Sequence, residues 1–478
     1  MNRGGASSFF ELGINRNQST YAAPNIPVRG QIPEWLEGNY VRNGPGLFNL
    51  KGRRLNHWFD GLGALHSFNI RNGQVDYLSK FIQCQSYDSA VNTGELQFSE
   101  FASDPCRSIF KKVQSYLFPS LPNMTDNPKI HVARIGERYL ALGETPMQVE
   151  FDPRSLERVG VQKPLPGMLA YKTTAHPHFE NGQAFNLVVQ FGMRSHYRIY
   201  PMNNGQRPIA SVPIAKPAYL HGFGMSEKYF IIAAGPLVVV PLQLLFWKKP
   251  YIENHRWLPE EGGQIWVIEK STGQLKARFE TDPFFSFHHV NAWEEGEELV
   301  MDLNAYADAS IVSSYYLREL EKPDVLLPGG YLHRYRLNLR TRKASHERIS
   351  DAVIELPRID YERYNTRGDY GFVYGVSIHP QHPRGFYNSL VKINSRNGSS
   401  TYWYQEGCYP GEPLFVPKPS SRNDEDGLVI SVVLDTVQQN SFLVLLDAAT
   451  LQEVGRATVP EPILYGFHGE FFSETPTP

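Results

Sequence analysis

The sequence predicts an all-β fold: a seven-bladed β-propeller in which long loops and short helices form a cap over one face. Three observations predict it. Aromatic residues, which favour strands, make up 13% of the chain. Glycine and proline, which favour tight turns, occur 39 and 35 times. Hairpin patterns recur along the whole chain.

Each hairpin pattern has an alternating apolar strand, a turn rich in Asp, Asn, Ser or Gly, and a second short strand. A four-stranded propeller blade ends in such an outer hairpin, so one hairpin is expected per blade. Hairpins also occur in other all-β folds, which this pattern alone leaves open. There are seven, unevenly spaced, at 68–75, 149–159, 197–206, 265–275, 335–343, 390–398 and 444–454.

Composition limits the other possibilities. No linker rich in Ser, Pro or Gly divides the 478 residues, so we expect a single domain, 1–478. A net charge of −2 without a long basic run argues against nucleic acid as a partner. Three scattered cysteines (Cys84, Cys106 and Cys408) suit a reducing compartment, by default the cytoplasm. Residues 1–21 lack the apolar stretch of a signal peptide, so secretion is not expected, and nothing indicates the oligomeric state.

Four short apolar stretches contain a histidine, and inner propeller strands converge on a central axis where such side chains can meet. Neutral imidazole suits Fe, Cu, Ni and Zn, although a single histidine of this kind is more often a satisfied core or loop residue. His178-Phe-Glu180 and His468-Gly-Glu470 also fit half of a two-histidine, one-carboxylate iron site. The four candidate positions are His176, His221, His288 with its neighbour His289, and His468.

Three carboxylates lie in apolar strand-like segments, where an unpaired charge would be costly. They are Glu144, Glu355 and Glu412. A metal-bound histidine normally donates its second ring N–H to such a carboxylate, which makes these three the candidate partners. The alternative is that each lies on the solvated face of a half-buried strand.

Two apolar segments beside lysines suggest peripheral contact with a membrane. The first, 237–247, is too short to span a bilayer, and the second is 113–121. Cys106, just before the second segment, is a site for acylation in that setting, but an inert packed cysteine is the favoured interpretation. Either segment could instead be a buried strand or line an internal tunnel. The candidate membrane-contact residues are Leu237, Leu242, Leu244, Leu245, Phe246 and Trp247.

A series of ordered blocks runs along nearly the whole chain: 38–46 (GNYVRNGPG), 57–61 (HWFDG), 66–68 (HSF), 174–178 (TAHPH), 287–295 (FHHVNAWEE), 411–417 (GEPLFVP) and 467–469 (FHG). These blocks resemble the carotenoid cleavage oxygenase family, and within it the segments 60–68, 104–110 and 125–127 resemble the animal β-carotene and retinoid branch. The resemblance implies a seven-bladed propeller with iron(II) on its axis. The implied ligands are His176, His221, His288 and His468, with Glu144, Glu355 and Glu412 orienting three of them. No catalytic residue is expected beyond this metal centre.

The chain departs from the family at Lys129-Ile130-His131, where cyanobacterial apocarotenoid members usually carry Asn-Thr-Asn. This departure places Ile130 near the expected oxygen site. His131 reads as a surface or strand histidine.

The resemblance implies a non-haem iron dioxygenase that uses O₂ to cleave a conjugated C=C bond of a carotenoid or apocarotenoid into aldehyde or ketone products. A long polyene would leave a membrane and enter an aromatic tunnel. Three alternatives stay open: a retinoid isomerase or isomerohydrolase using iron as a Lewis acid, cleavage of a stilbene-type phenolic alkene, and a propeller that only binds a pigment or partner.

Overall fold

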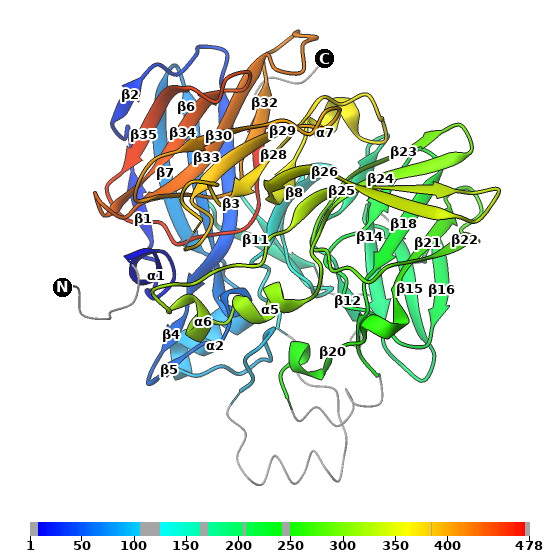
Figure 1. The fold of residues 1–478 in the computed structure, drawn as a ribbon. Coiled ribbons are helices and arrows are strands. Elements are labelled where there is room, and N and C mark those ends of the chain that lie inside the picture. The colour runs from blue at the N-terminus through cyan, green and yellow to red at the C-terminus, as the bar shows by residue number, and fades with distance from the viewer. Residues whose placement is uncertain are drawn as a thin grey trace.

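Seven antiparallel sheets, the blades of a β-propeller, make up the body of the molecule (Figure 1). They are seen in a computed structural model that describes residues 8–105, 125–162, 171–203, 207–240, 249–383 and 385–473. The predicted fold class, a seven-bladed propeller, is confirmed.

The first three blades span the N-terminal half of the chain and have five, four and five strands. Blade I has the order β1-β7-β6-β3-β36, with β1 Tyr21–Ala23, β3 Gly38–Leu47, β6 Leu62–Arg71, β7 Gln74–Phe81 and β36 Gly469–Ser473. Blade II contains β8 His131–Ile135, β9 Arg138–Leu142, β10 Gln148–Phe151 and β11 Arg158–Gln162. Blade III contains β12 Tyr171–Thr173, β13 His178–Glu180, β14 Gln183–Gln190, β15 Ser195–Pro201 and β16 Ala210–Ile214.

Blades IV to VI have four strands each, and blade VII has six. Blade IV contains β17 Gly224–Met225, β18 Tyr229–Ala234, β21 Gly263–Glu269 and β22 Leu275–Thr281. Blade V contains β23 His289–Glu295, β24 Glu298–Ala305, β25 Tyr331–Asn338 and β26 Ala344–Val353; blade VI contains β27 Glu355–Arg358, β28 Phe372–Ser377, β29 Ser389–Asn394 and β30 Ser400–Tyr404. Blade VII contains β2 Val28–Gly30, β31 Cys408–Pro410, β32 Leu414–Pro417, β33 Gly427–Asp435, β34 Asn440–Asp447 and β35 Glu453–Val459.

Each of the seven predicted hairpins falls in a different blade. The pattern at 335–343, for example, joins β25 to β26, and the one at 444–454 joins β34 to β35. The turn residues 204–206 of the third hairpin lie outside the described residues. Outer strands such as β26 are largely exposed, whereas β17 at the start of blade IV is fully buried. Buried apolar side chains from neighbouring blades pack together and fill the spaces between the blades.

Strands from opposite ends of the chain close the ring. The late strand β36 pairs with β3 in blade I, and the early strand β2 pairs with β35 in blade VII. Strand β3 and the segment just before β36 lie very close together. A Cβ atom on Gly44 of β3 would lie 2.5 Å from the Cα atom of Gly466, which explains why glycine occupies this contact. Both pairings are antiparallel, so backbone hydrogen bonds hold the late strand β36 in blade I and the early strand β2 in blade VII.

Several short helices lie at one end of the propeller, as predicted for a cap, whereas α7 lies at the other end (Figure 1). Figure 1 shows α2, α5 and α6 below the blades, together with the strands β4, β5 and β20. The helices are α1 Ser8–Gly13, α2 Gln85–Thr93, α5 Ser310–Ser314, α6 Leu317–Leu320 and α7 Tyr361–Tyr364, with 3₁₀ turns at Trp58–Asp60, Tyr251–Asn254 and Pro259–Glu261. There are also two small two-stranded sheets in the described structure. In one, β4 Asn49–Leu50 pairs with β5 Arg53–Arg54, and in the other, β19 Leu237–Val238 pairs with β20 Arg256–Trp257. Apolar side chains of α1, α5 and α6 belong to the same buried cluster as Trp58.

Two buried histidines near the N-terminus make stability depend on pH. Burial lowers the pKa of both His57 and His66 to about 3. In the unfolded chain these side chains take up protons near pH 6.5. Their contribution to stability is therefore complete above pH 6.5 and is lost as the pH falls toward 3. We expect the free energy of unfolding to fall by about 1.4 kcal/mol per pH unit for each histidine in this window.

Urea denaturation at several pH values between 7 and 4 measures this slope. His66→Gln keeps a hydrogen-bonding group next to the Tyr77 hydroxyl, which lies 2.8 Å from His66 Nδ1, and removes one titrating imidazole. We expect this variant to have a shallower slope, and the control His382→Gln, at an exposed position, to match the parent. An unchanged slope in His66→Gln would contradict the assignment.

Candidate metal centre

Four histidines from four blades meet near the propeller axis. His176 lies between β12 and β13, and His221, His288 and His468 each lie just before the first residue of β17, β23 or β36. Their ligating nitrogen atoms all lie within 4.8 Å of one another. The structure therefore brings together all four histidines that the sequence proposed as metal ligands.

Three of these imidazoles donate a hydrogen bond from Nδ1 to a buried carboxylate. The Nδ1-to-oxygen distances are 2.6 Å for His221 with Glu144, 2.7 Å for His288 with Glu355 and 2.7 Å for His468 with Glu412. Because Nδ1 is bound in this way, Nε2 is the nitrogen left to face the centre, and His288 Nε2 lies 3.2 Å from His468 Nε2. This is the arrangement that fixes histidine tautomers at metal sites.

A second layer of donors supports the carboxylates. The Tyr219 hydroxyl donates to Glu144 at 2.7 Å, and the Tyr306 hydroxyl donates to Glu355 at 2.8 Å. Burial alone would raise the pKa of both carboxyl groups, but the partner histidines and these hydrogen bonds outweigh it, and the net pKa of each is lowered. Glu412 instead accepts from the Gly469 N–H at 2.8 Å and lies 3.6 Å from the Arg358 guanidinium.

His176 has no carboxylate partner in the described part of the chain. Its Nε2 atom is buried and makes no hydrogen bond with any described residue. Burial first, and then the neighbouring imidazoles, hold the pKa of His176 and of His468 well below the usual 6.5. The cluster therefore offers four imidazole nitrogens, and that of His176 is buried without a hydrogen-bond partner. Such a set of ligand atoms is expected of a metal site, so the residues fit a divalent transition metal.

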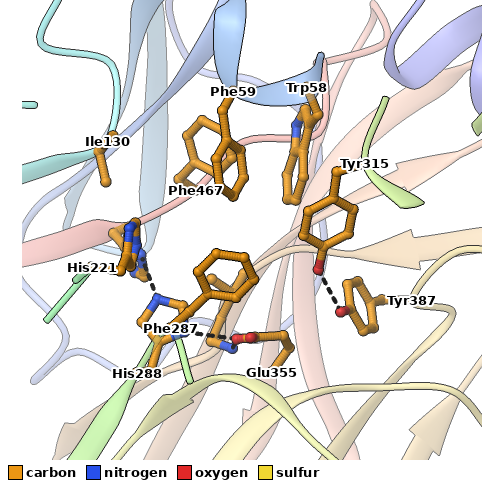
Figure 2. Close-up of a pocket in the computed structure, with 12 residues that line it drawn as sticks. Trp58, Phe59, Ile130, His221, Phe287, His288, Tyr315, Glu355, Tyr387 and Phe467 are labelled. Atoms are coloured by element: carbon orange, nitrogen blue, oxygen red, sulfur yellow. Dashed lines mark hydrogen bonds and ion pairs between the residues drawn. The ribbon is translucent and has the colours of Figure 1, made fainter. Parts of the chain in front are cut away.

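An apolar pocket lies against the histidine cluster (Figure 2). Cap residues provide part of its wall, among them Trp58, Phe59 and Tyr315. Ile130 also lines it, as expected from its place in the sequence, on the side of His221. The other lining residues are His221, Phe287, His288, Glu355, Leu356, Tyr387, Phe467 and His468.

Two other histidine predictions turn out differently. His131 lies on strand β8, as one reading expected, but it is buried rather than on the surface: its ring centroid lies 5.7 Å from that of His176 and 5.4 Å from that of His468. His178 does not take part in a two-histidine, one-carboxylate iron site. Its ring nitrogens contact the Tyr361 hydroxyl at 2.8 Å and the Phe223 carbonyl at 2.7 Å. Glu470 pairs with Arg358 instead.

The predicted membrane-contact residues are only partly within the described residues. Leu237 belongs to β19 and is buried. Leu242, Leu244, Leu245, Phe246 and Trp247 lie outside the described residues, as do Cys106 and the segment 113–121. Across the described ranges, none of the helices has both the length and the apolar character needed to cross a bilayer.

The sequence did not predict the tyrosines that bind the carboxylates or line the cavity next to them. Tyr306, Tyr315 and Tyr387 carry no motif, and they come together only through the fold. Tyr219 did have a signal, because it stands two residues before His221, a spacing that places both side chains on one face of an extended segment.

Comparison with known proteins identifies the family. The family model described as "Retinal pigment epithelial membrane protein" matches residues 14–473. The chain belongs to this family, the carotenoid cleavage oxygenases. One relative in the family, the human β,β-carotene 15,15′-dioxygenase, is 32% identical over 96% of this chain and 94% of its own length. The mitochondrial carotenoid-cleaving dioxygenase of Mustela putorius furo is 30% identical over 95% of this chain and 94% of its own.

A solved structure from the family has the same fold. The cobalt-substituted apocarotenoid oxygenase of Synechocystis superposes with a TM-score of 0.87 at 23% identity, over 98% of this chain and all of that one.

Proposed function

We propose that the protein is a non-haem iron(II) dioxygenase that cleaves a conjugated C=C bond of a carotenoid or apocarotenoid with O₂, giving aldehyde or ketone products. One observation carries this proposal: four imidazoles, three of them bound to buried carboxylates, converge beside an apolar cavity. The family supports the reaction class, since two relatives are named as dioxygenases that act on carotenoids.

The chain's own groups suit such a reaction. Glu144, Glu355 and Glu412 orient three imidazoles, which together with His176 would offer four neutral nitrogen atoms to a metal. Iron(II) held in this way would keep its full positive charge and activate O₂ for the cleavage. A solved structure with the same fold is described as cobalt-substituted, which supports a metal at this position.

The cavity favours a polyene. Its wall contains Trp58, Phe59, Phe287 and Phe467, and aromatic faces pack well against a conjugated chain. Aromatic contacts connect these rings, with 5.7 Å between the centroids of Phe59 and Phe287 and 5.2 Å between those of Phe59 and Phe467. Such a wall excludes water from the bond to be cleaved.

Metal analysis combined with paired aerobic and anaerobic assays tests the proposal. The assays use β-carotene, an apocarotenal and resveratrol as substrates. We expect near-stoichiometric iron and carbonyl products from a carotenoid or apocarotenoid in air, with none under argon. Product formed without oxygen would overturn the dioxygenase proposal in favour of an isomerase, cleavage of resveratrol alone would favour a stilbene-type enzyme, and a metal-free protein would contradict the iron site.

We also propose that residues 1–478 act as one propeller domain. Peripheral membrane contact and a cytoplasmic location stay predictions from the sequence.

A further inference from the structure

A fifth buried imidazole lies beside the four proposed metal ligands. His131 belongs to β8, the first strand of blade II, and its side chain is 6% exposed. The His131 ring stacks against that of His176, with 24° between the ring planes. It meets the His468 ring edge-on, with 79° between the planes. One side chain outside the ligand set therefore contacts two ligand rings.

The order of the blades places His131 between these two ligands. His468 directly precedes β36 in blade I, and His176 lies between β12 and β13 in blade III. Strand β8 of blade II packs against β3 and β36 on one side. On the other side, its apolar residues share a buried cluster with Ala175 and Ala184 of blade III. The His131 ring thus lies where the segments that carry His468 and His176 approach each other.

His176 is the ligand that most needs such a neighbour. Each of the other three imidazoles donates a hydrogen bond to a buried glutamate, which fixes its ring plane. His176 has no carboxylate partner in the described part of the chain, and its buried Nε2 atom makes no hydrogen bond there. Among the described rings that contact His176, only His131 lies outside the set of proposed ligands.

The backbone that carries His131 is held in place on both sides. The Ile130 N–H donates to the Leu142 carbonyl at 2.9 Å, and the Ile130 carbonyl accepts from the His468 N–H at 3.1 Å. The His131 carbonyl accepts from the Asn43 side-chain amide at 3.0 Å. Because this backbone is already ordered, packing the ring against a neighbouring ring costs little further conformational entropy.

His131 contacts the ligands through its ring rather than through its Nδ1 atom. That atom is buried and makes no hydrogen bond with any described residue. His131 is also not one of the four histidines whose ligating atoms lie within 4.8 Å of one another. Burial holds the pKa of His131 well below the usual 6.5, so the ring is neutral and does not repel a bound cation.

We propose that His131 is a positioning residue of the metal centre, whose ring holds the His176 ring in the orientation needed to bind the metal. This inference rests on the proposed function, since it concerns the same metal site. Aromatic packing of this kind is expected to slow metal loss by about three- to tenfold. His131 is not among the described residues that line the cavity, so its substitution changes the support of the metal site and not the cavity wall.

Two complementary substitutions separate the ring from its nitrogen atoms. Phenylalanine keeps an aromatic ring without nitrogen, whereas asparagine keeps a polar atom near the place of Nδ1 and removes the rest of the ring. The measurement is the rate at which Co²⁺-loaded protein loses its metal to an excess of chelator under argon. His131→Asn should lose Co²⁺ about three- to tenfold faster than the parent, and His131→Phe within about twofold of the parental rate.

The visible absorption spectrum of the bound Co²⁺ gives a second readout, because it reports the geometry of the ligands around the metal. We expect a changed spectrum in His131→Asn and the parental spectrum in His131→Phe. His289→Asn is the matched control. The His289 ring nitrogens are also buried without a hydrogen-bond partner among the described residues, but His289 is not part of the four-histidine cluster. The control should lose Co²⁺ at the parental rate.

Two results would overturn the proposal. One is a parental rate of metal loss in His131→Asn, and the other is loss from His131→Phe as fast as from His131→Asn, which would assign the effect to the nitrogen atoms or to a general disturbance of the fold. A parent that binds no metal would overturn this inference together with the iron site. The measurement needs neither O₂ nor substrate. A metal-loaded protein that cleaves no carotenoid would therefore contradict the proposed dioxygenase and leave the role of His131 standing.

Discussion

Replacing His288 with alanine is expected to reduce cleavage at least about 100-fold and to lower the iron content of the purified protein. The change removes one of four converging nitrogen donors. It also leaves the Glu355 carboxylate buried without the imidazole that binds it at 2.7 Å. Breaking a buried pair by removing one partner typically costs about 3–5 kcal/mol of stability.

A second variant separates loss of metal from loss of folding. In the double variant His288→Ala with Glu355→Gln, the buried side chain is neutral, so the folded state should be recovered while the metal donor is still missing. His289→Ala is the control. The His289 imidazole is next in sequence to His288, is not part of the four-histidine cluster and makes no hydrogen bond with any described residue. Circular dichroism and metal analysis should show a folded, iron-poor double variant and an iron-replete control. Full iron content in the double variant would contradict the assignment of His288.

Replacing Glu412 with glutamine is expected to weaken metal retention by about 10- to 100-fold, as is typical when a ligand's hydrogen-bond partner is changed. Glutamine can still accept a hydrogen bond from His468 Nδ1. However, it removes the negative charge that makes this imidazole a stronger ligand for the metal. It also replaces the second carboxylate oxygen, which accepts from the Gly469 N–H at 2.8 Å, with an NH₂ group that cannot accept this hydrogen bond. The rate of metal loss to an excess of chelator measures the effect.

Glu470→Gln is the matched control for Glu412→Gln. Arg358 contacts both carboxylates, 2.9 Å from Glu470 and 3.6 Å from Glu412, whereas in the described structure only Glu412 binds His468. We expect Glu470→Gln to lose metal at the parental rate. Equal acceleration in both variants would show that the effect passes through Arg358 rather than through the histidine.

The blades could be predicted from the sequence because each hairpin is local. The alternation and turn residues at 444–454, for example, already specify the β34–β35 hairpin. The pairing of β2 with β35 could not be predicted in the same way, since neither strand carries information about a partner more than 400 residues away. Closure of the ring is a property of the whole chain.

The candidate site shows the same division. The four histidines and three glutamates lie in short, distinctive segments, so their types and positions were accessible from the sequence. His131 was misread because the strand pattern states only that successive side chains alternate, not which face lies toward the axis. The contacts of Tyr315 with Tyr387 and of Tyr306 with Glu355 form only after blades V and VI and the cap have assembled.

Closure by the two end strands has a consequence for the order in which the protein matures. His468 directly precedes β36, so the last donor to the metal is synthesised together with the strand that completes blade I. A nascent chain still emerging from the ribosome can fold individual hairpins, but it offers an incomplete set of donors. Tight metal capture thus belongs to the finished ring, and the metal would act as a late check on correct assembly.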